Sequence, residues 1–377
     1  MASLYVHIPF CLARKCLYCD FVSMPYSRTA SERYLAALAK ELSLVPFPED
    51  KRTLGSLFIG GGTPTALEAG QLAKLMGAIR EKFGFRQGAE VTAEANPATI
   101  DAEKLGALAE NGINRLSIGV QSFSGRELMV LGRLHSPKDA LDAVKAAREA
   151  GFKEISIDLI YGIPGQTEED WKRTLETALE LEAGHISAYE LTLEEDTPLS
   201  GLVKNGAVAL PGEDETLGLY FLACETLEGA GYVHYEVSNY ALPGRESLHN
   251  MNYWRRGEYL GVGAAAHSFM NGKRWKNTDD ILRYMEVLEA GALPAEDVAE
   301  LAPEEEKREF VFLGLRTLEG LSVSAGKDLL GTDIAEAAAP LVKEGLLTIS
   351  NGRLHATRAG FPVLNTVILR LLACLGL

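Results

Sequence analysis

Short apolar runs alternate with longer amphipathic segments along the first half of the chain. The runs predict strands at residues 4–8, 56–59, 90–93, 115–120, 154–160 and 185–191. Between them, apolar residues recur at helical spacing, which predicts helices at residues 31–44, 69–83, 102–111, 138–150 and 168–181. Thr167 and Asp170 fit a capping box at the start of the last of these helices.

Strands and helices that alternate at this spacing form βαβ units and a parallel sheet. Six units are too few to close an eight-stranded barrel. We therefore predict an α/β fold, an open, partial (β/α)6 barrel of the TIM type, with a lateral cleft for a bulky substrate. Functional groups should gather at the C-terminal ends of its strands.

The alternation stops after a helix predicted at residues 214–229. Residues 232–275 are rich in aromatic side chains and predict mostly loop, and residues 290–303 predict an exposed linker. The rest predicts helices at 304–317, 323–330, 334–344 and 363–375, and a hairpin of 346–349 with 353–356. Helix–helix–hairpin is the order of a winged helix. We thus predict a barrel at 1–230, an extension at 231–300 and a small winged-helix-like α+β domain at 301–377.

The charge balance argues against one class of partner. The chain carries 52 acidic and 37 basic residues, a formal net charge of −15, and lacks the basic patch that nucleic-acid binding requires. No apolar run is long enough to span a bilayer, and no targeting signal precedes the first strand. Cys224 and Cys374 lie singly on helical patterns, which predicts buried free thiols. A reducing, cytoplasmic location suits them.

Three of the five cysteines, Cys11, Cys16 and Cys19, lie within nine residues directly after the first strand. Iron prefers soft thiolate ligands, and three thiolates on one loop suit a four-iron cluster whose fourth iron stays open for a ligand. The alternative is a zinc loop completed by His7. Zinc loops usually pair two CxxC-like knuckles, however, and only one occurs here.

The segment HIPFCLARKCLYCDF resembles the cluster loop of the radical S-adenosylmethionine (SAM) superfamily, in the branch of the oxygen-independent coproporphyrinogen III oxidases. The resemblance implies that Cys11, Cys16 and Cys19 hold a 4Fe-4S cluster. The open iron of that cluster would chelate SAM, and one electron would cleave it. The family spacing is C-x3-C-x2-C, whereas four residues separate Cys11 from Cys16 here.

Other motifs at the strand ends match SAM-binding positions of this family. Residues 60–65, GGGTPT, match the loop that holds the methionyl amino group, and their amides could also bind a carboxylate. The resemblance implies SAM contacts for Tyr5, Gly61, Gly62, Thr63, Glu94, Gln121, Arg133 and Asp158. Two alternatives need no ligand: Glu94 as a solvated strand-end carboxylate, and Asp158 paired with Arg133 for structure alone.

Two features separate the branches of this family. The true oxidases carry a further cysteine two residues after the last cluster cysteine, where this chain has Phe21, and a long segment before the cluster loop. Residues 249–254, HNMNYW, match the HNxxYW motif of the HemW-type haem chaperones. His249 would be an axial ligand of haem iron, and Tyr253 and Trp254 would offer apolar surface to the porphyrin. Alternatively, His249 is a core histidine beside packing aromatics.

The resemblance thus implies a haem chaperone that binds a 4Fe-4S cluster, SAM and haem and delivers haem to acceptors such as respiratory enzymes. An electron donor protein and peripheral membrane contact through the acceptor are further expected partners. The alternative function is a coproporphyrinogen III oxidase, which decarboxylates two propionates without oxygen. No residue is predicted to be catalytic. Nearby Arg245, Arg255 and Arg256 could pair with haem propionates.

Overall fold

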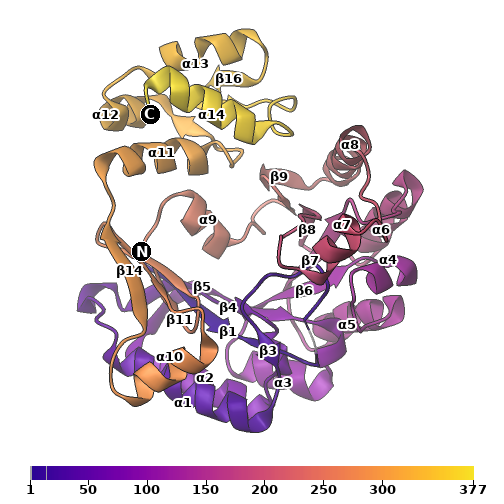
Figure 1. Ribbon diagram of the computed structural model, residues 1–377, viewed down its shortest axis with the longest axis vertical. Coiled ribbons are helices and arrows are strands. Elements are labelled where there is room, and N and C mark those ends of the chain that lie inside the picture. The colour runs from indigo at the N-terminus through magenta and orange to yellow at the C-terminus, as the bar shows by residue number, and fades with distance from the viewer. Residues whose placement is uncertain (1, 14) are drawn as a thin grey trace.

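A computed structural model of the protein describes residues 2–13 and 15–377. Within this part of the chain, one twelve-stranded sheet runs in the order β14-β13-β12-β11-β1-β4-β5-β6-β7-β8-β10-β9. Its centre is a parallel run of six strands: β1 (Ser3–Ile8), β4 (Thr53–Gly61), β5 (Gly84–Ala95), β6 (Arg115–Gln121), β7 (Glu154–Tyr161) and β8 (His185–Glu190). These match the six predicted strands, so the partial open barrel is confirmed (Figure 1).

Helices cover the outer face of this sheet. They are α1 (Arg28–Leu44), α2 (Ala69–Lys82), α3 (Ala102–Glu110), α4 (Gly125–Val130), α5 (Pro137–Glu149), α6 (Glu168–Glu180), α7 (Pro198–Lys204) and α8 (Glu213–Gly229), with 3-10 turns η1 (Glu49–Lys51), η2 (Pro64–Ala66) and η3 (Pro97–Thr99). The capping box at Thr167 is confirmed, because its hydroxyl accepts from the Asp170 amide at 3.1 Å and Asp170 accepts from the Thr167 amide. The short helices α4 and α7 were not predicted, since one or two turns carry little periodicity.

The sheet core is continuous. Leu4, Leu57, Ala93, Leu116 and Ile157 are fully buried side chains of the five adjacent strands β1, β4, β5, β6 and β7, and they pack with the inner faces of the surrounding helices. A two-stranded pair, β2 (Phe10–Cys11) and β3 (Met24–Pro25), brackets the cysteine loop. The loop is therefore fixed at both ends to the barrel, directly beyond the C-terminal end of β1.

The region predicted as mostly loop at 232–275 is more regular than expected. It contains β9 (Val233–Glu236), β10 (Asn239–Ala241), α9 (Leu248–Trp254), β11 (Tyr259–Val262), β12 (His267–Met270) and β13 (Lys273–Asn277), followed by α10 (Ile281–Glu289). The predicted linker at 290–303 holds β14 (Ala295–Glu300), an exposed edge strand paired with β13. Strands of three to six residues leave too short a pattern to be detected in the sequence.

The C-terminal segment has its own apolar core. It comprises α11 (Pro303–Gly314), β15 (Leu321–Ser322), α12 (Val323–Leu330), α13 (Ile334–Lys343), β16 (Leu347–Ser350), β17 (Arg353–Ala356) and α14 (Leu364–Leu375). The predicted hairpin forms around Asn351 and Gly352, whose φ angles of 49° and 72° suit its tight turn. Cys224 is buried as predicted, but Cys374 is exposed on the last helix, which corrects that prediction.

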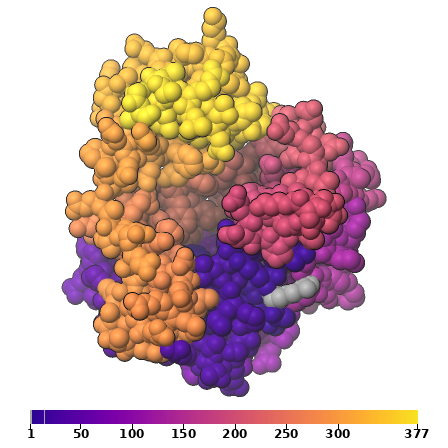
Figure 2. Space-filling model, in the orientation of Figure 1, coloured from indigo at the N-terminus to yellow at the C-terminus, as the bar shows by residue number. Residues whose placement is uncertain are grey.

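The C-terminal segment stands above the open side of the barrel, and α9 lies between the two, in contact with β4 and α11 (Figure 1). The space-filling view shows a hollow bounded by this segment, the β13–β14 arm and the barrel (Figure 2). No described helix is long and apolar enough to cross a membrane.

Candidate cofactor site

The C-terminal ends of the barrel strands line a cavity of about 390 Å³. This volume lies within the usual range of small-molecule pockets, about 300–1,000 Å³. Its wall brings together ten of the fourteen predicted site residues, namely Cys11, Cys16, Cys19, Gly61, Gly62, Thr63, Glu94, Gln121, Arg133 and Asp158. The other four, Tyr5, His249, Tyr253 and Trp254, are not part of this wall.

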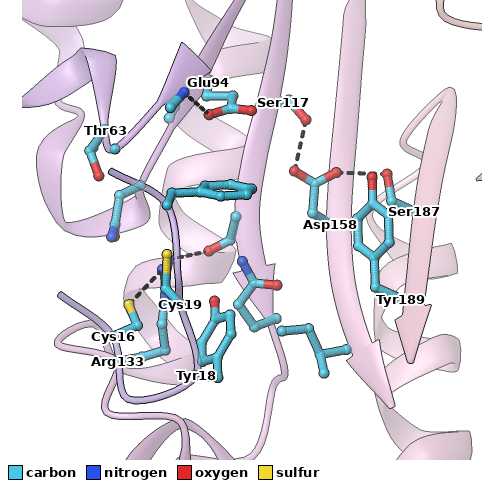
Figure 3. Close-up of a pocket in the computed structure, with 18 of the residues that line it drawn as sticks. Cys16, Tyr18, Cys19, Thr63, Glu94, Ser117, Arg133, Asp158, Ser187 and Tyr189 are labelled. Carbon is cyan, nitrogen blue, oxygen red and sulfur yellow. Dashed lines mark hydrogen bonds between the residues drawn. The ribbon is translucent and has the colours of Figure 1, made fainter. Parts of the chain in front are cut away.

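All three cysteines of the loop line this cavity, and Figure 3 shows Cys16 and Cys19 beside Arg133. Arg133 Nη1 donates to Cys16 Sγ over 3.4 Å, and burial raises the pKa of the Cys19 thiol to about 11. Within residues 2–13 and 15–377, no three Cys, His, Asp or Glu side chains are gathered closely enough to hold a metal ion. The loop must therefore draw its thiols together to hold a cluster. Three thiols beside a guanidinium fit an anionic iron–sulfur cluster.

His7 is unsuited to complete a zinc site. Its Nε2 lies 2.8 Å from the carbonyl oxygen of Val22, which can only accept, so this nitrogen carries the proton. Its Nδ1 then accepts from the Tyr5 hydroxyl at 3.1 Å. Both ring nitrogens of His7 are thus occupied, and its bond to Val22 ties the cysteine loop to β1. Tyr5 stacks on Phe58 of the cavity wall, with ring centroids 6.3 Å apart.

Three amides of the glycine loop, those of Gly61, Gly62 and Thr63, are already occupied by acceptors of the protein itself. The Gly61 amide donates to Glu94 Oε2 at 3.0 Å, the Gly62 amide to Ile8 O at 2.9 Å, and the Thr63 amide to Phe10 O at 2.7 Å. This corrects the idea that these amides bind a carboxylate. The group beside this loop that lines the cavity is the carboxylate of Glu94, which can accept hydrogen bonds from an ammonium group. A Cβ on Gly62 would lie 2.7 Å from Phe10 O, so only glycine fits there.

Glu94 and Asp158 are two half-buried carboxyl groups that line the same cavity (Figure 3). Desolvation and the charge of Asp158 together raise the pKa of Glu94 to about 8. Burial likewise raises the pKa of Asp158, against the hydrogen bonds it accepts. Glu94 thus holds its proton more tightly when the cavity contains no cation, and a cationic ligand would favour its ionised form. Glu94 is not a solvated strand-end carboxylate.

Asp158 is not paired with Arg133, which corrects the structural alternative drawn from the sequence. It accepts from three serine hydroxyls, those of Ser117 on β6 at 2.7 Å, Ser156 on its own strand β7 at 3.3 Å and Ser187 on β8 at 2.8 Å. Arg133 instead bonds Cys16 and the carbonyl oxygen of Gly119. This serine set was not predicted from the sequence, although polar residues at alternate positions of the predicted strands, such as Ser156 and Asp158, indicate a polar strand face.

Gln121 ends β6 in a left-handed conformation with φ 69°, directly after a register shift in the sheet. A non-glycine residue pays about 1 kcal/mol or more for this backbone conformation. The register shift changes the direction of the Gln121 side chain and brings its amide nitrogen close to Gly119. A Cβ added to Gly119 would lie only 2.9 Å from this nitrogen. Gln121 therefore lies in the cavity wall beside Arg133.

His249 on α9 has no free ring nitrogen in this structure. Nδ1 lies 2.9 Å from Ser56 Oγ, Nε2 lies 2.8 Å from the Tyr253 hydroxyl, and the ring stacks on Phe58 at 5.2 Å. Desolvation lowers its pKa to about 3, so the imidazole is neutral. Its environment is that of a core histidine, the alternative left open by the sequence. Binding iron through His249 requires one of these two hydrogen bonds to break.

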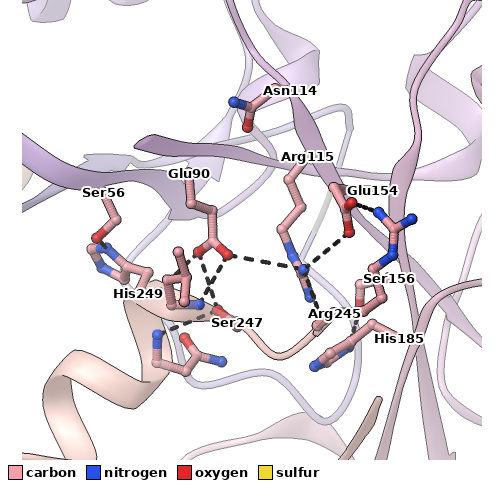
Figure 4. A network of polar contacts seen from close by, with 12 residues as sticks. Ser56, Glu90, Asn114, Arg115, Glu154, Ser156, His185, Arg245, Ser247 and His249 are labelled. Carbon is pink, nitrogen blue, oxygen red and sulfur yellow. Dashed lines mark hydrogen bonds and ion pairs between the residues drawn. The ribbon is translucent and has the colours of Figure 1, made fainter. Parts of the chain in front are cut away.

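A buried carboxylate from the barrel anchors the start of α9 (Figure 4). Glu90 of β5 accepts from the Leu248 amide at 2.9 Å, the His249 amide at 3.0 Å and the Ser247 hydroxyl at 3.3 Å. Arg115, 3.9 Å away, balances its charge. Ser247 and Asn250 of this helix start also line the cavity. The HNxxYW segment is thus fixed at the inner end of the cofactor cavity.

Trp254 and the three arginines near the motif already make contacts within the protein. Trp254 packs, half-buried, against an apolar cluster beside Met251, and its indole nitrogen has no hydrogen-bond partner within the described residues. The three nearby arginines are paired with carboxylates: Arg245 with Glu154, Arg255 with Glu319 and Arg256 with Glu306. Propionates would have to compete for them, which weakens the expectation that they are free to bind haem.

Sequence comparisons match both halves of the chain to known families. Residues 5–178 match the radical SAM superfamily, and residues 301–363 match the HemN C-terminal domain. The heme chaperone HemW of Bacillus subtilis (strain 168) is 37% identical over 365 residues, 96% of each chain. That of Mycobacterium tuberculosis is 36% identical over 98% of this chain and 94% of its own, and that of Escherichia coli is 38% identical over 73% of each.

Among solved structures, coproporphyrinogen III oxidase (HemN) from Escherichia coli, described as a radical SAM enzyme, superimposes with a TM-score of 0.83. It is 25% identical and covers 98% of this chain and 89% of its own. The fold of this protein is therefore that of the radical SAM barrel with the C-terminal domain of this branch. The superfamily implies a 4Fe-4S cluster and SAM as cofactors, and the thiols and carboxyl groups of the cavity fit them. At these identities and coverages, the chain belongs to the HemW family of the radical SAM superfamily.

Proposed function

We propose that this protein is a haem chaperone that binds haem and hands it to acceptor proteins. The observation that carries the proposal is the position of α9. A helix with the HNxxYW sequence is anchored by Glu90 at the inner end of the cavity that also contains the three cysteines. Relatives 36–37% identical over almost their whole length are named heme chaperones, which supports the same function.

The proposed roles follow the grouping of residues around the cavity. Cys11, Cys16 and Cys19 would hold the cluster. Gly61, Gly62, Thr63, Glu94, Gln121, Arg133 and Asp158 would contact SAM, with Tyr5 behind the wall. His249, Tyr253 and Trp254 would belong to the haem side. When bound, the cluster supplies single electrons and an open iron for SAM. The protein's own part is to bind the ammonium of SAM at Glu94 and to keep Arg133 beside a cluster thiolate.

The proposal also covers the acceptors, the electron donor and the domain division. The acceptors are respiratory haem enzymes, reached in the cytoplasm through peripheral contact at a membrane, and a separate protein donates electrons. Nucleic acid is not a partner. We also propose the division into a barrel at 1–230, an extension at 231–300 and a C-terminal domain at 301–377. The separate apolar core of the last segment supports that boundary.

A coproporphyrinogen III oxidase is the second candidate, favoured by the likeness to HemN. The residue against it is Phe21, which stands in the cavity wall with its side chain exposed, where the oxidases have a cysteine. An apolar ring cannot donate a proton or a hydrogen atom as a thiol can.

An anaerobic assay separates the two functions. The reconstituted protein, given reductant, SAM and coproporphyrinogen III, is expected to form no protoporphyrinogen above a blank without protein. Phe21→Cys serves as the matched variant, because it restores only the thiol. Multiple turnovers by the unaltered protein would replace the chaperone proposal with the oxidase.

A further inference from the structure

The structure leaves few histidines able to bind haem iron. An axial ligand needs a side chain that a porphyrin can reach and a ring nitrogen with a free lone pair. The chain has seven histidines, all within the described residues. Five of them are buried: His7, His135, His185, His234 and His249. In His249, moreover, both nitrogens are already engaged, by Ser56 and Tyr253.

Two histidines remain, His267 and His355. His355 lies in the C-terminal hairpin, where its Nδ1 donates to the carbonyl oxygen of Leu318 at 2.9 Å. His267 begins β12, is exposed, and its ring makes no hydrogen bond to another described residue. His267 is thus the accessible imidazole with both nitrogens uncommitted.

Strand pairing locates His267 on the face of the sheet that the motif helix adjoins. Phe269 pairs with Tyr259 across β11 and β12, and His267, two residues before Phe269, shares its face because side chains alternate along a strand. Tyr253 of α9 packs edge-on against Tyr259, with ring centroids 4.6 Å apart. The HNxxYW helix and His267 therefore border the same surface, with aromatic rings between them.

Two cations lie beside His267 on this surface, and both already pair with carboxylates. Lys276 pairs with His267 across β12 and β13, and Arg274 pairs with Phe269. Both cations are half-buried and hold carboxylates: Lys276 holds Asp297 at 3.5 Å, and Arg274 holds Glu309 at 2.7 Å. Burial and these two cations lower the pKa of His267, which favours the neutral imidazole that binds metals.

We infer that His267 supplies an axial nitrogen to haem iron on the face of β11–β13 beside α9. The inference rests on the proposed haem binding and deepens it by naming the ligand. The nitrogen donates its lone pair to the iron, and no electron or proton leaves the protein. His249 is then a positioning residue, because its hydrogen bond fixes the Tyr253 ring against Tyr259.

Haem titrations of the full-length protein test the inference, followed by Soret absorption and by EPR of the ferric complex. His267→Ala is expected to lose the imidazole-ligated spectrum and to bind haem at least about tenfold more weakly. His267→Cys should give a thiolate-type spectrum, a gain that a structural role cannot produce. His355→Ala is the matched control, since it also removes a single accessible imidazole, and it should leave the spectrum unchanged.

The outcomes separate this inference from the function on which it rests. If the unaltered protein binds no haem, the proposed function fails. If it binds haem and His267→Ala keeps the same spectrum and affinity, the ligand inference alone is overturned. Loss of the imidazole spectrum in His249→Gln or His355→Ala, but not in His267→Ala, overturns it as well. Far-ultraviolet circular dichroism shows whether each variant is folded.

Discussion

At the scale of single residues, the cavity combines thiols, carboxyl groups and a guanidinium on one wall. Ten predicted residues converge on one wall because they follow successive parallel strands, whose ends meet at a common edge. The partner of Asp158 was predicted wrongly, because no sequence pattern says which side chains of neighbouring strands stand opposite. His249 likewise matched a motif, but one of the two bonds that occupy its ring comes from Ser56, which is distant in sequence, and the other from Tyr253, one helical turn along α9.

The cysteine loop gives a prediction of metal content. Reconstituted anaerobically, the protein should hold about four irons per chain, because three thiolates support one four-iron cluster. Cys16→Ala should lose most of this iron, since its thiol is the one held beside Arg133. Cys224→Ala is the control, a buried thiol outside the cavity. Iron and acid-labile sulfide analyses measure the result. Full iron in Cys16→Ala would refute the loop assignment, and zinc would indicate the alternative site.

Glu94 gives a prediction of pH dependence. Its pKa is 4.5 in the unfolded reference and about 8 in the fold, so the folded protein retains a proton that the unfolded chain releases. Between pH 4.5 and 8 the free energy of unfolding therefore falls as pH rises, by at most about 1.4 kcal/mol per pH unit from this group.

Glu94→Gln should remove that slope while keeping the shape and an acceptor for the Gly61 amide. Urea unfolding of both proteins at several pH values from 5 to 8 measures the difference. The variant should gain stability over the unaltered protein as pH rises toward 8. A difference that is constant across this range would mean that Glu94 titrates normally.

At the scale of elements, regular helices and strands were predictable and the short ones were not. The alternation of residues 4–191 identified every parallel strand, because each short apolar run is next to a helix of three turns or more whose period is clear. Between residues 232 and 300 the strands are too short to show a period, and their pairing depends on the edge that β1 offers to β11. The Asn351–Gly352 turn was predictable, since its residues favour positive φ themselves.

The anchoring of α9 gives the prediction at this scale. Glu90→Ala removes three hydrogen bonds to the helix start and leaves Arg115 less well balanced. We expect a loss of about 2–3 kcal/mol in unfolding free energy, the usual value for hydrogen bonds to a charged group. Amide exchange at residues 247–254 should accelerate.

Glu154→Ala is the matched control for this variant. Glu154 is the other carboxylate beside Arg115, also 3.9 Å away, but it is more exposed and makes no bond to α9. It should leave amide exchange at 247–254 close to that of the unaltered protein. Equal effects of the two variants would mean that α9 is held by the general charge balance around Arg115 and not by Glu90.

At the scale of the whole molecule, the sheet, α9 and the C-terminal segment frame one hollow (Figure 2). Two ion pairs join its sides: Arg256 of the α9 end to Glu306 of α11, and Arg274 of β13 to Glu309. The barrel class was predictable because it follows from alternation alone. The hollow was not predictable, because its shape depends on how β14 and α11 place the C-terminal segment relative to the barrel.

We propose that haem binds in this hollow. The most direct measurement is a titration of the reconstituted protein with haem under anaerobic conditions, followed by the Soret band. We expect saturable binding of about one haem per chain with an imidazole-type spectrum, and transfer of that haem to an added apo-haem protein. An unsaturable, non-specific rise without a distinct band would contradict it.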